Sequence, residues 1–409
     1  MNVWMVYQDA ITPDFPGGTR HYDFAMELAN KGNCVKIFAA NVNLSLRKQV
    51  KDVGHTLFSE ERIGLVAFEW VSTCSYQRNN WRRAFNMIIF GLNAYRTGTL
   101  QDDDPDIIIG SSPNLFAAFA ACLLAKQKRT RFILEIRDIW PQVLIDMGIS
   151  KYHPLVIVFR FIEKYLYDNA DGFVVLAKGT IKYLTDYGIE RGMISYIPNG
   201  VHLEHFKTQV SRDEARKKFG FDTFTIVYSG VHGPSHSLQT LLESANELRN
   251  EPIKFVLIGD GSKKNELIDK AQELGLDNVR FLSPLPKKEI SSLLSAADVG
   301  VVMLKNVPVF RYGISPNKLF DYMAAGLPVI ASVQGEVEGF IRRVGCGLSV
   351  VPENSQELSK AIMELYSKSE SELREMGRYG RAEIEKNFSR VKLVSKLETS
   401  IKNACAINV

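Results

Sequence analysis

The stretch Tyr312–Gly326 brings together residue types that can bind a phosphorylated ligand at the start of a helix. Ser315 is a good N-cap residue and Pro316 suits the first helical position, so the pattern predicts that a helix begins here. The N–H groups and the positive dipole end of such a helix favour a diphosphate, and Lys318 adds a full positive charge. One turn further on, Asp321 can accept both hydroxyls of a ribose. The alternative interpretation is an ordinary amphipathic helix that packs its apolar residues inward.

Two glycine-containing loops also stand between a predicted strand and a predicted helix. Gly17 and Gly18 follow the first strand and let the backbone approach a ligand, but they do not form the G-x-G-x-x-G pattern of dinucleotide-binding proteins. In the second half of the chain, Gly230 and Gly233 lie in the corresponding loop. Each loop can cradle a phosphate, and the alternative interpretation is a simple turn.

The loop of the second half also contains His232 and His236, four residues apart. This spacing forms a metal site only when both histidines lie on one helix with further ligands, and Pro234 between them disfavours such a helix. We therefore expect the histidines to donate hydrogen bonds to a phosphate or a sugar hydroxyl. Scaffolding of the loop is the alternative.

Charged residues end another predicted strand, in the sequence Glu-Ile-Arg-Asp-Ile-Trp-Pro. Arg137 and Asp138 lie there beside an aromatic residue and a proline, which favours a binding loop over a structural contact of Arg137 with Glu135 or Asp138. The run Asp102–Asp104 contains the Asp-x-Asp pattern of some metal-binding motifs. It precedes its strand and adjoins a proline, so a solvated turn is the better interpretation.

The composition is that of a globular protein with two domains. The 409 residues exceed the ~250–300 at which a single core stops growing, and the net charge of +4 is too small for a dedicated nucleic-acid binder. The five cysteines are scattered and never in C-x-x-C spacing, which favours free thiols in a reducing cytosol over disulfides or zinc. No apolar run reaches the ~18 residues of a membrane span, and the first residues predict a strand rather than a signal peptide. We therefore expect a cytoplasmic protein.

Short β-branched runs alternate with helical patterns along the whole chain, which predicts α/β domains with parallel sheets covered by helices on both faces. The rhythm restarts after Ile197–Val201, so we expect two doubly wound domains, 1–200 and 201–389, and a helix at about 390–409 that can pack back on the first. Ligands of such sheets sit beyond the carboxyl ends of the strands, and two such domains can face one another across a cleft. The predicted strands are Val3–Tyr7, Val35–Ala39, Ile107–Gly110, Arg131–Ile136, Gly172–Leu176, Ile194–Ile197, Phe224–Ser229, Lys254–Gly259, Val279–Leu282, Val299–Met303 and Val329–Ala331.

One segment of the first half interleaves basic with aromatic residues, as a helix on an anionic membrane surface does, and further basic residues cluster in a second segment. Helices around a core have the same composition, so the pattern leaves peripheral membrane contact open. The residues are Arg78, Trp81, Arg82, Arg83, Phe85, Phe90, Tyr95 and Arg96 in the first segment, and Lys126, Lys128, Arg129 and Arg131 in the second.

Several motifs together resemble glycosyltransferase family 4 over nearly the whole chain and in the right order. They are the Gly17-Gly18 pair, the Ile-Pro-Asn-Gly-Val junction and the Ser-Pro-Asn-Lys-Leu-Phe-Asp-Tyr helix followed by Leu-Pro-Val-Ile. The helix motif and Glu-Ile-Arg-Asp-Ile-Trp-Pro are similar to the WbuB-like subgroup of polysaccharide and O-antigen transferases. The resemblance implies a GT-B fold of two Rossmann-like domains. It also implies a retaining sugar transfer from a nucleoside diphosphate donor, with no cofactor and no bound metal.

Carried over by position, the resemblance implies that Asp321 holds the ribose where the family has the second Glu of its Glu-x7-Glu motif. Gly313 occupies the position of the first Glu, so backbone N–H groups around Gly313 and Ile314, or another side chain, must take over its contact with the donor sugar. The Arg and Lys that grip the diphosphate in the family align with Pro234 and His236. We expect Lys318, His236 and the helix N-terminus to replace them.

The position of the family's acceptor-side histidine is occupied by Arg137, and Asp138 follows it. Arg137 and Asp138 are expected to act in catalysis together with Lys318 and His236. Glu338 matches a family position near the donor, and the loop that contains Pro284 and Leu285 is expected to recognise the base. The remaining expected donor contacts are Gly17, Gly18, Gly230, His232, Gly233, Ser315, Asn317 and Leu319.

The resemblance implies transfer of a hexose such as glucose, or of an N-acetylated hexosamine, from a UDP-sugar to a lipid-linked or oligosaccharide acceptor in exopolysaccharide or O-antigen synthesis. Such an enzyme would work in the cytoplasm or peripherally at the inner face of the plasma membrane. One alternative is a sugar-nucleotide epimerase, which needs an acid/base pair at the sugar and no acceptor. Another is a non-catalytic nucleotide-sugar-binding protein, given the departures at Gly313 and Pro234.

Overall fold

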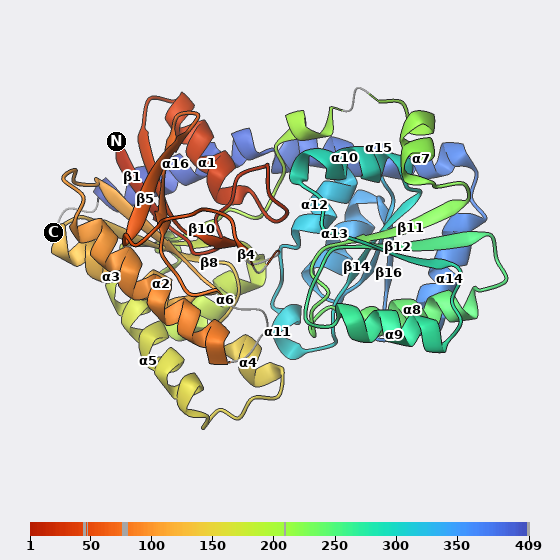
Figure 1. The fold of residues 1–409 in the computed structure, drawn as a ribbon, viewed down its shortest axis with the longest axis horizontal. Helices are drawn as coiled ribbons and strands as arrows, with labels where there is room; N and C mark the ends of the chain where they lie inside the picture. The colour runs from red at the N-terminus through yellow and green to blue at the C-terminus, as the bar shows by residue number, and fades with distance from the viewer. Residues whose placement is uncertain (44–45, 47, 76–80, 208–209, 407–409) are drawn as a thin grey trace. The chain divides into compact units, whose positions relative to one another are not determined.

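The computed structural model describes residues 1–43, 46, 48–75, 81–207 and 210–406, so the expected membrane-contacting Arg78 lies outside the described residues. The chain forms two compact units (Figure 1). The first unit comprises Met1–Thr12, Gly18–Pro198 and Arg390–Val409, and the second comprises Pro13–Gly17 and Asn199–Ser389.

The first unit contains an eight-stranded sheet in the order β10-β9-β8-β7-β1-β2-β6-β5. All neighbouring strands are parallel except β5, which runs antiparallel to β6. The strands of this unit are β1 (Asn2–Val6), β2 (Cys34–Ala40), β5 (Phe58–Ile63), β6 (Val66–Val71), β7 (Ile107–Ser111), β8 (Arg131–Ile136), β9 (Gly172–Val175) and β10 (Ile194–Tyr196), with a separate small pair β3 (Val42–Asn43) and β4 (Lys48–Gln49).

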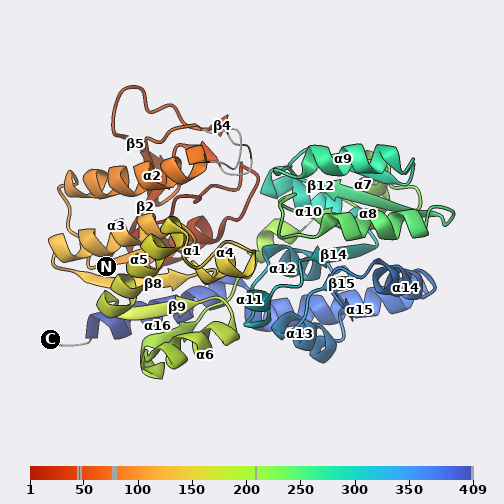
Figure 2. The same ribbon diagram turned by 90° about the horizontal axis from the view of Figure 1, so that it is seen from below.

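Helices cover both faces of this sheet, because side chains of a strand point alternately to either side. On β1, Trp4 and Val6 join the core formed with α2, α3, α5 and α6, while Val3 and Met5 join the core formed with α1 and α16. The view from below (Figure 2) shows α2, α3 and α5 side by side. The helices are α1 (Arg20–Asn30), α2 (Trp81–Thr99), α3 (Leu115–Gln127), α4 (Gln142–Asp146), α5 (Pro154–Asn169), α6 (Lys178–Tyr187), the 3-10 turn Arg191–Met193 and α16 (Arg390–Ala406).

The second unit contains a six-stranded, fully parallel sheet in the order β13-β12-β11-β14-β15-β16. Its strands are β11 (Phe224–Ser229), β12 (Ile253–Ile258), β13 (Val279–Leu282), β14 (Val299–Met303), β15 (Val329–Ser332) and β16 (Gly347–Val350). Its helices are α7 (Arg212–Phe219), α8 (Leu238–Glu247), α9 (Lys264–Glu273), α10 (Lys287–Ala296), α11 (Pro308–Arg311), α12 (Asn317–Ala324), α13 (Glu336–Val344), α14 (Ser355–Tyr366) and α15 (Glu370–Glu383), with short turns Leu203–Phe206 and Ile384–Phe388.

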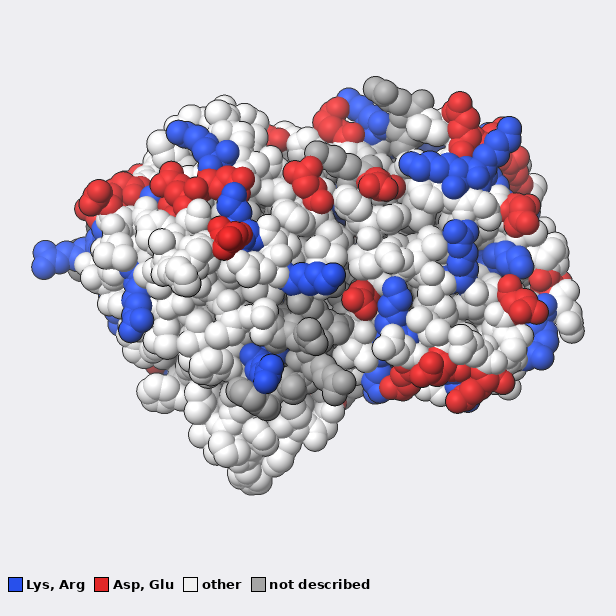
Figure 3. All heavy atoms as spheres, in the orientation of Figure 1, with Lys and Arg blue, Asp and Glu red and all other residues white. Residues whose placement is uncertain are grey.

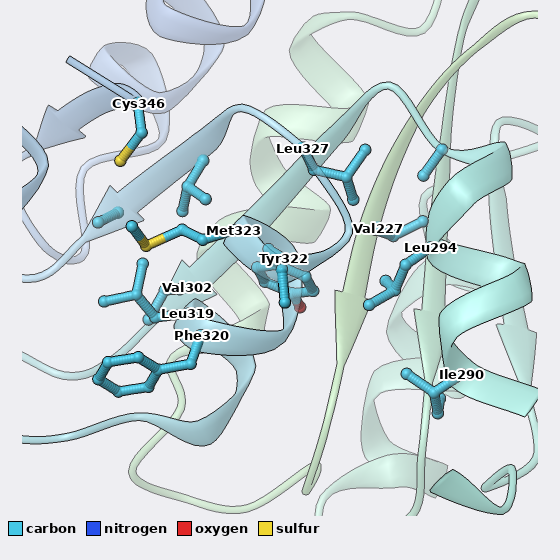
Figure 4. Packing of buried hydrophobic residues seen from close by; sticks show 14 of the residues in the cluster. Val227, Ile290, Leu294, Val302, Leu319, Phe320, Tyr322, Met323, Leu327 and Cys346 are labelled. Carbon is cyan, nitrogen blue, oxygen red and sulfur yellow. The ribbon is translucent and has the colours of Figure 1, made fainter. Parts of the chain in front are cut away.

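Helix α12 is fixed to the sheet by its inner face, which Figure 4 shows from close by. Leu319, Phe320 and Met323 are buried in the core of this unit. The buried Tyr322 accepts a hydrogen bond from the backbone N–H of Ser229, at the end of β11, over 2.8 Å. The apolar face that sequence periodicity predicted is therefore present, and it fixes the height of the helix start above the strand ends.

The predicted strands are confirmed to within one residue at each end, and the two doubly wound α/β series are present. The helix start is a correction, because α12 begins at Asn317 and Pro316 is the residue before it. Strands β3, β4, β5, β6 and β16 and helices α4, α7, α11, α13 and α15 were not predicted.

Candidate functional site

The strand order of the second unit places two loops at the point where a doubly wound sheet binds ligands. The chain continues from β11 to β12 on one side and from β14 to β15 on the other, so the loops after β11 and β14 separate there. The loop after β11 contains Gly230, and the chain beyond β14 leads into α12 with Lys318.

Lys318 lies directly over the loop after β11. Its Nζ donates a hydrogen bond to the Tyr228 hydroxyl over 3.1 Å and lies 4.4 Å from the centre of that ring. A Cβ at Gly230 would lie 2.9 Å from Cε of Lys318 and would displace the lysine, and the φ of 153° at this position also favours glycine. Lys318 is half-buried. The removal of its ammonium group from water lowers the pKa of Lys318 to about 7. A bound anion would restore its full charge.

His236 lies beside this lysine. Its backbone N–H donates to the carbonyl of Gly233, and its ring stands edge-on to Tyr228 with 6.3 Å between ring centres. Burial, Lys318 and His232 hold the pKa of His236 well below its usual value, so the imidazole is neutral. A neutral imidazole can donate one hydrogen bond to a phosphate oxygen. The structure thus brings together the expected Lys318, His236, Gly230 and Gly233.

The other histidine of the loop has a different environment. His232 is fully buried, and neither ring nitrogen has a partner among the described residues. Burial lowers its pKa to about 4. The ring lies near Tyr228 and Phe281, and its expected contact with the donor stays a prediction.

The first turn of α12 keeps its N–H groups available, because the expected cap is engaged elsewhere. The Ser315 hydroxyl accepts a hydrogen bond from the Asn199 N–H over 2.8 Å, so it does not cap the helix. The N–H groups of Asn317 and Lys318 precede the first intrahelical hydrogen bond. By contrast, Leu319 is in the core and its N–H donates to the carbonyl of Pro316, so it has no group for the donor.

Asp321 lies one turn further along α12, as predicted, and it is paired within the protein. Its Oδ2 accepts from Nζ of Lys287 over 2.6 Å, and both side chains are largely buried. This bond leaves the second carboxylate oxygen, Oδ1, unused by Lys287. Lys287 follows the loop of Pro284 and Leu285, so the ion pair joins that loop to α12.

The remaining expected donor residue, Glu338, lies in the first turn of α13. It accepts a hydrogen bond from Arg342 of the same helix over 2.8 Å. This pair is partly exposed.

In the first unit, the corresponding point of the sheet lies between β1 and β7. The buried Glu135 there accepts from Arg20 and Ser111 over 2.9 and 2.8 Å, and His21 lies 2.9 Å from it. Burial opposes ionisation, but Arg20 and His21 hold the pKa of Glu135 well below its usual range. These contacts connect the first turn of α1 with the carboxyl ends of β7 and β8.

Arg137 lies above these contacts and packs over Tyr7, with its guanidinium carbon 4.9 Å from the ring centre. Its Nη1 is buried and has no partner among the described residues. Asp138 beside it is exposed. Arg137 is therefore a cation with unused hydrogen-bonding capacity at a strand end, which is suited to a polar or anionic ligand.

Gly17 and Gly18 precede α1 as predicted, and Gly17 has a positive φ of 136°. They fall at the border of the two units, Gly17 in the second and Gly18 in the first. The aspartates at 102–104 are structural, because Asp103 pairs with Lys36 and Asp104 with Lys128.

Sequence reasoning missed the partners of the predicted residues. Tyr228 and Lys287 contact Lys318 and Asp321 from positions 90 and 34 residues away. One available signal was the place of Tyr228 near the end of a strand, just before a glycine.

Two doubly wound α/β units, with Lys318 at the switch point of the second sheet, are the architecture of the GT-B class. Solved structures agree with this fold: sucrose-phosphate synthase of Thermosynechococcus elongatus superposes with a TM-score of 0.78 at 18% identity, covering 100% of both chains. Anabaena HepE, solved in complex with UDP-glucose, gives a TM-score of 0.72 at 14% identity and covers 98% of this chain and 99% of its own.

Sequence comparisons define the family. The family described as Glycosyltransferase Family 4 matches residues 17–205, and the one described as Glycosyl transferases group 1 matches residues 211–383. The chain therefore belongs to glycosyltransferase family 4.

Two curated relatives extend this finding. WcaI of Escherichia coli, named for colanic acid biosynthesis, is 26% identical over 271 residues, which are 63% of this chain. The chain spans 65% of the length of WcaI. WbjE of Pseudomonas aeruginosa, named as a glycosyltransferase, is 23% identical over 308 residues, which cover 73% of this chain and 74% of WbjE.

Proposed function

We propose that this protein transfers a hexosyl residue, glucose or an N-acetylated hexosamine, from a UDP-sugar to a lipid-linked or oligosaccharide acceptor in polysaccharide synthesis. The observation that carries the proposal is the cluster of Lys318, Tyr228, Gly230 and His236 beside the first turn of α12. HepE was solved with UDP-glucose and WcaI is named for a polysaccharide, which supports a nucleotide-sugar donor and this class of product.

In the proposed reaction, the bond between the anomeric carbon and the β-phosphate oxygen breaks, and the acceptor oxygen bonds to that carbon from the same face. The acceptor hydroxyl proton passes to a phosphate oxygen of the departing UDP. Negative charge increases on the phosphate as the bond breaks, so fixed donors there stabilise the transition state most. Lys318, His236 and the N–H groups of Asn317 and Lys318 are these donors.

The cluster supplies positive charge from side chains and a helix end, so we propose that transfer needs no bound metal. Asp321 is proposed to accept a ribose hydroxyl on the oxygen that Lys287 does not occupy. Arg137 and Asp138 of the first unit are proposed to bind the acceptor, and the protein is proposed to act in the cytoplasm.

The direct test is release of UDP by the purified full-length chain from a panel of UDP-sugars, with and without a lipid-linked saccharide extract, in the presence and absence of EDTA. We expect acceptor-dependent UDP release that EDTA leaves unchanged. Lys318→Met should lower the rate by about a hundredfold, as removal of one oxyanion donor does. Lys270→Met is the matched control, because this lysine forms an exposed pair with Glu273 on α9.

An epimerase would instead convert the sugar nucleotide without releasing UDP. A binding protein would retain the nucleotide sugar unchanged. Either result, with the wild-type chain folded, would overturn the proposed transfer.

A further inference from the structure

Helix α5 presents apolar side chains on two faces. Its inner face packs Val156, Phe159 and Ile162 into the core of the first unit. Its outer face exposes Ile157 and Phe161, of which 56% and 70% of the surface is accessible. A helix that is apolar on all sides is normally buried, so we expect the outer face of α5 to contact a partner.

The connection that precedes α5 continues this exposed surface. Ile149 and Tyr152 are exposed there, Tyr152 to 74%, and Val158 on α5 is exposed as well. We call these five residues, Ile149, Tyr152, Ile157, Val158 and Phe161, the α5 patch. In the space-filling view (Figure 3), the lobe formed by α4, α5 and their connection is almost entirely white.

On α5 itself, Arg160 and Lys164 pair with Glu163 and Asp168, so the net positive charge of this surface comes from the segment before the helix and from α2. Residues 147–162 contain no Asp or Glu but contain Lys151 and Arg160, and Lys151 lies 5.1 Å from the Tyr152 ring centre. The helix layer that α5 belongs to continues this pattern, because residues 70–101, which include α2, also contain no acidic residue. Tyrosine and lysine beside aliphatic side chains are the residue types of a membrane–water interface.

Neighbouring helices of the same layer expose further apolar side chains. Helix α3 packs against both α2 and α5, with Phe116 contacting Gly91 on one side and Phe159 on the other. On α2, Phe85 and Leu92 are exposed two turns apart. The layer α2–α3–α5 therefore combines apolar outer side chains with basic residues.

From these observations we propose that the α5 patch docks the protein on an anionic phospholipid bilayer. The negative lipid surface complements the acid-free segments, and the exposed apolar side chains enter the headgroup boundary. A two-fold contact between copies would instead bring the net positive segments 70–101 and 147–162 of two chains together. With 16 residues, α5 is ~24 Å long, too short to span the ~30 Å hydrocarbon core, so it would lie along the surface. Among the described residues, no helix is long and apolar enough to cross a bilayer.

The inference goes beyond the proposed sugar transfer and does not need it, although it would bring the enzyme to a lipid-linked acceptor. The test is co-sedimentation of the full chain with vesicles of phosphatidylcholine alone, or with about one-third phosphatidylglycerol, without nucleotide. We expect binding to the anionic vesicles that weakens at high salt. The double variant Ile157→Ser, Phe161→Ser should bind about tenfold more weakly or worse.

Leu65→Ser is the matched control, because Leu65 is exposed to 49% in the turn between β5 and β6 and should leave binding unchanged. Circular dichroism verifies that each variant is folded. The proposal is overturned if the wild type does not co-sediment with anionic vesicles, or if the double variant binds them with the affinity of the wild type. If the wild type does not bind vesicles but forms a dimer, and the double variant is a monomer, the α5 patch is a self-association surface instead. Vesicle binding without sugar transfer would overturn the proposed function alone.

Discussion

If Lys318 binds the diphosphate as proposed, nucleotide binding should depend on pH. Its pKa of about 7 in the free protein must rise when a diphosphate binds, because the anion favours the protonated amine. Above about pH 7, the affinity for UDP should therefore fall with rising pH, by up to about tenfold per pH unit, until the pKa of the complex is reached. Neighbouring groups do not titrate there, since burial raises the pKa of Tyr228 and lowers that of His236.

Calorimetry between about pH 7 and 9, in buffers of different ionisation enthalpy, measures this proton uptake directly. Lys318→Met should bind UDP more weakly and show no such uptake. A wild-type affinity that stays constant over this range would remove the lysine from the diphosphate site.

Asp321 pairs with Lys287 and is proposed to bind the ribose, and a single substitution removes both interactions at once. Asp321→Ala should weaken UDP binding through the ribose, and it should also destabilise the fold by about 2 kcal/mol because Lys287 loses its buried partner. The double variant Asp321→Ala, Lys287→Met should recover stability in urea denaturation but not UDP affinity. If the double variant regains affinity as well, the carboxylate acts only as the partner of the lysine.

At the scale of elements, the height of α12 over the sheet is fixed by a close contact. A Cβ at Gly300 of β14 would lie 2.5 Å from the ring of Tyr322. Gly300→Ala should therefore push α12 outward, cost about 1–3 kcal/mol of unfolding free energy and weaken UDP binding through the displaced first turn. Thermal unfolding and UDP titration measure both effects.

Gly339→Ala is the control for that substitution. Gly339 lies in α13, where an added Cβ would meet no atom of a neighbouring element within 4 Å, and alanine favours a helix. The stability of this variant should equal or exceed that of the wild type. Unchanged stability and affinity in Gly300→Ala would show that α12 tolerates the shift.

The elements that sequence reasoning located are those with strong local patterns. The β-branched runs of β11 and β14 are buried on both faces and are bounded by glycine or polar turns, so they could be predicted almost to the residue. Strand β5 was missed because its sequence Phe-Ser-Glu-Glu-Arg-Ile is that of an exposed antiparallel edge. The start of α12 was misplaced because Ser315 has the right type for a cap, and only the distant Asn199 engages it.

At the scale of the whole molecule, long-range pairs decide what local patterns cannot. Arg20 is buried and donates to the carbonyls of Ile197 and Pro198, where the chain leaves the first unit. Where the chain returns, Arg390 is buried and pairs with Asp23 of α1. These contacts join residues almost 180 and 370 positions apart, and nothing in the sequence around either arginine indicates its partner. The candidate residues could therefore be predicted, but not the distant partners that hold them in place.

Helix α16 completes the core of the first unit although it follows the second unit in sequence. Leu393, Val394, Leu397 and Ile401 are buried against α1 and the sheet. Since each such side chain contributes ~1.5–3 kcal/mol, their loss is comparable to the ~5–15 kcal/mol stability of a domain. A chain ending at Ser389 should therefore lose the fold of the first unit and keep that of the second.

Limited proteolysis with mass spectrometry tests this outcome: a resistant fragment of about residues 199–389 should remain while the first unit is digested. UDP titration should show that the remaining unit still binds nucleotide through the Lys318 cluster. Val391→Ala, at an exposed position of the same helix, should leave the whole chain resistant, whereas Leu397→Ala should speed cleavage of the first unit alone. If the shortened chain kept a protease-resistant first unit, α16 would be a covering helix that this core does not require.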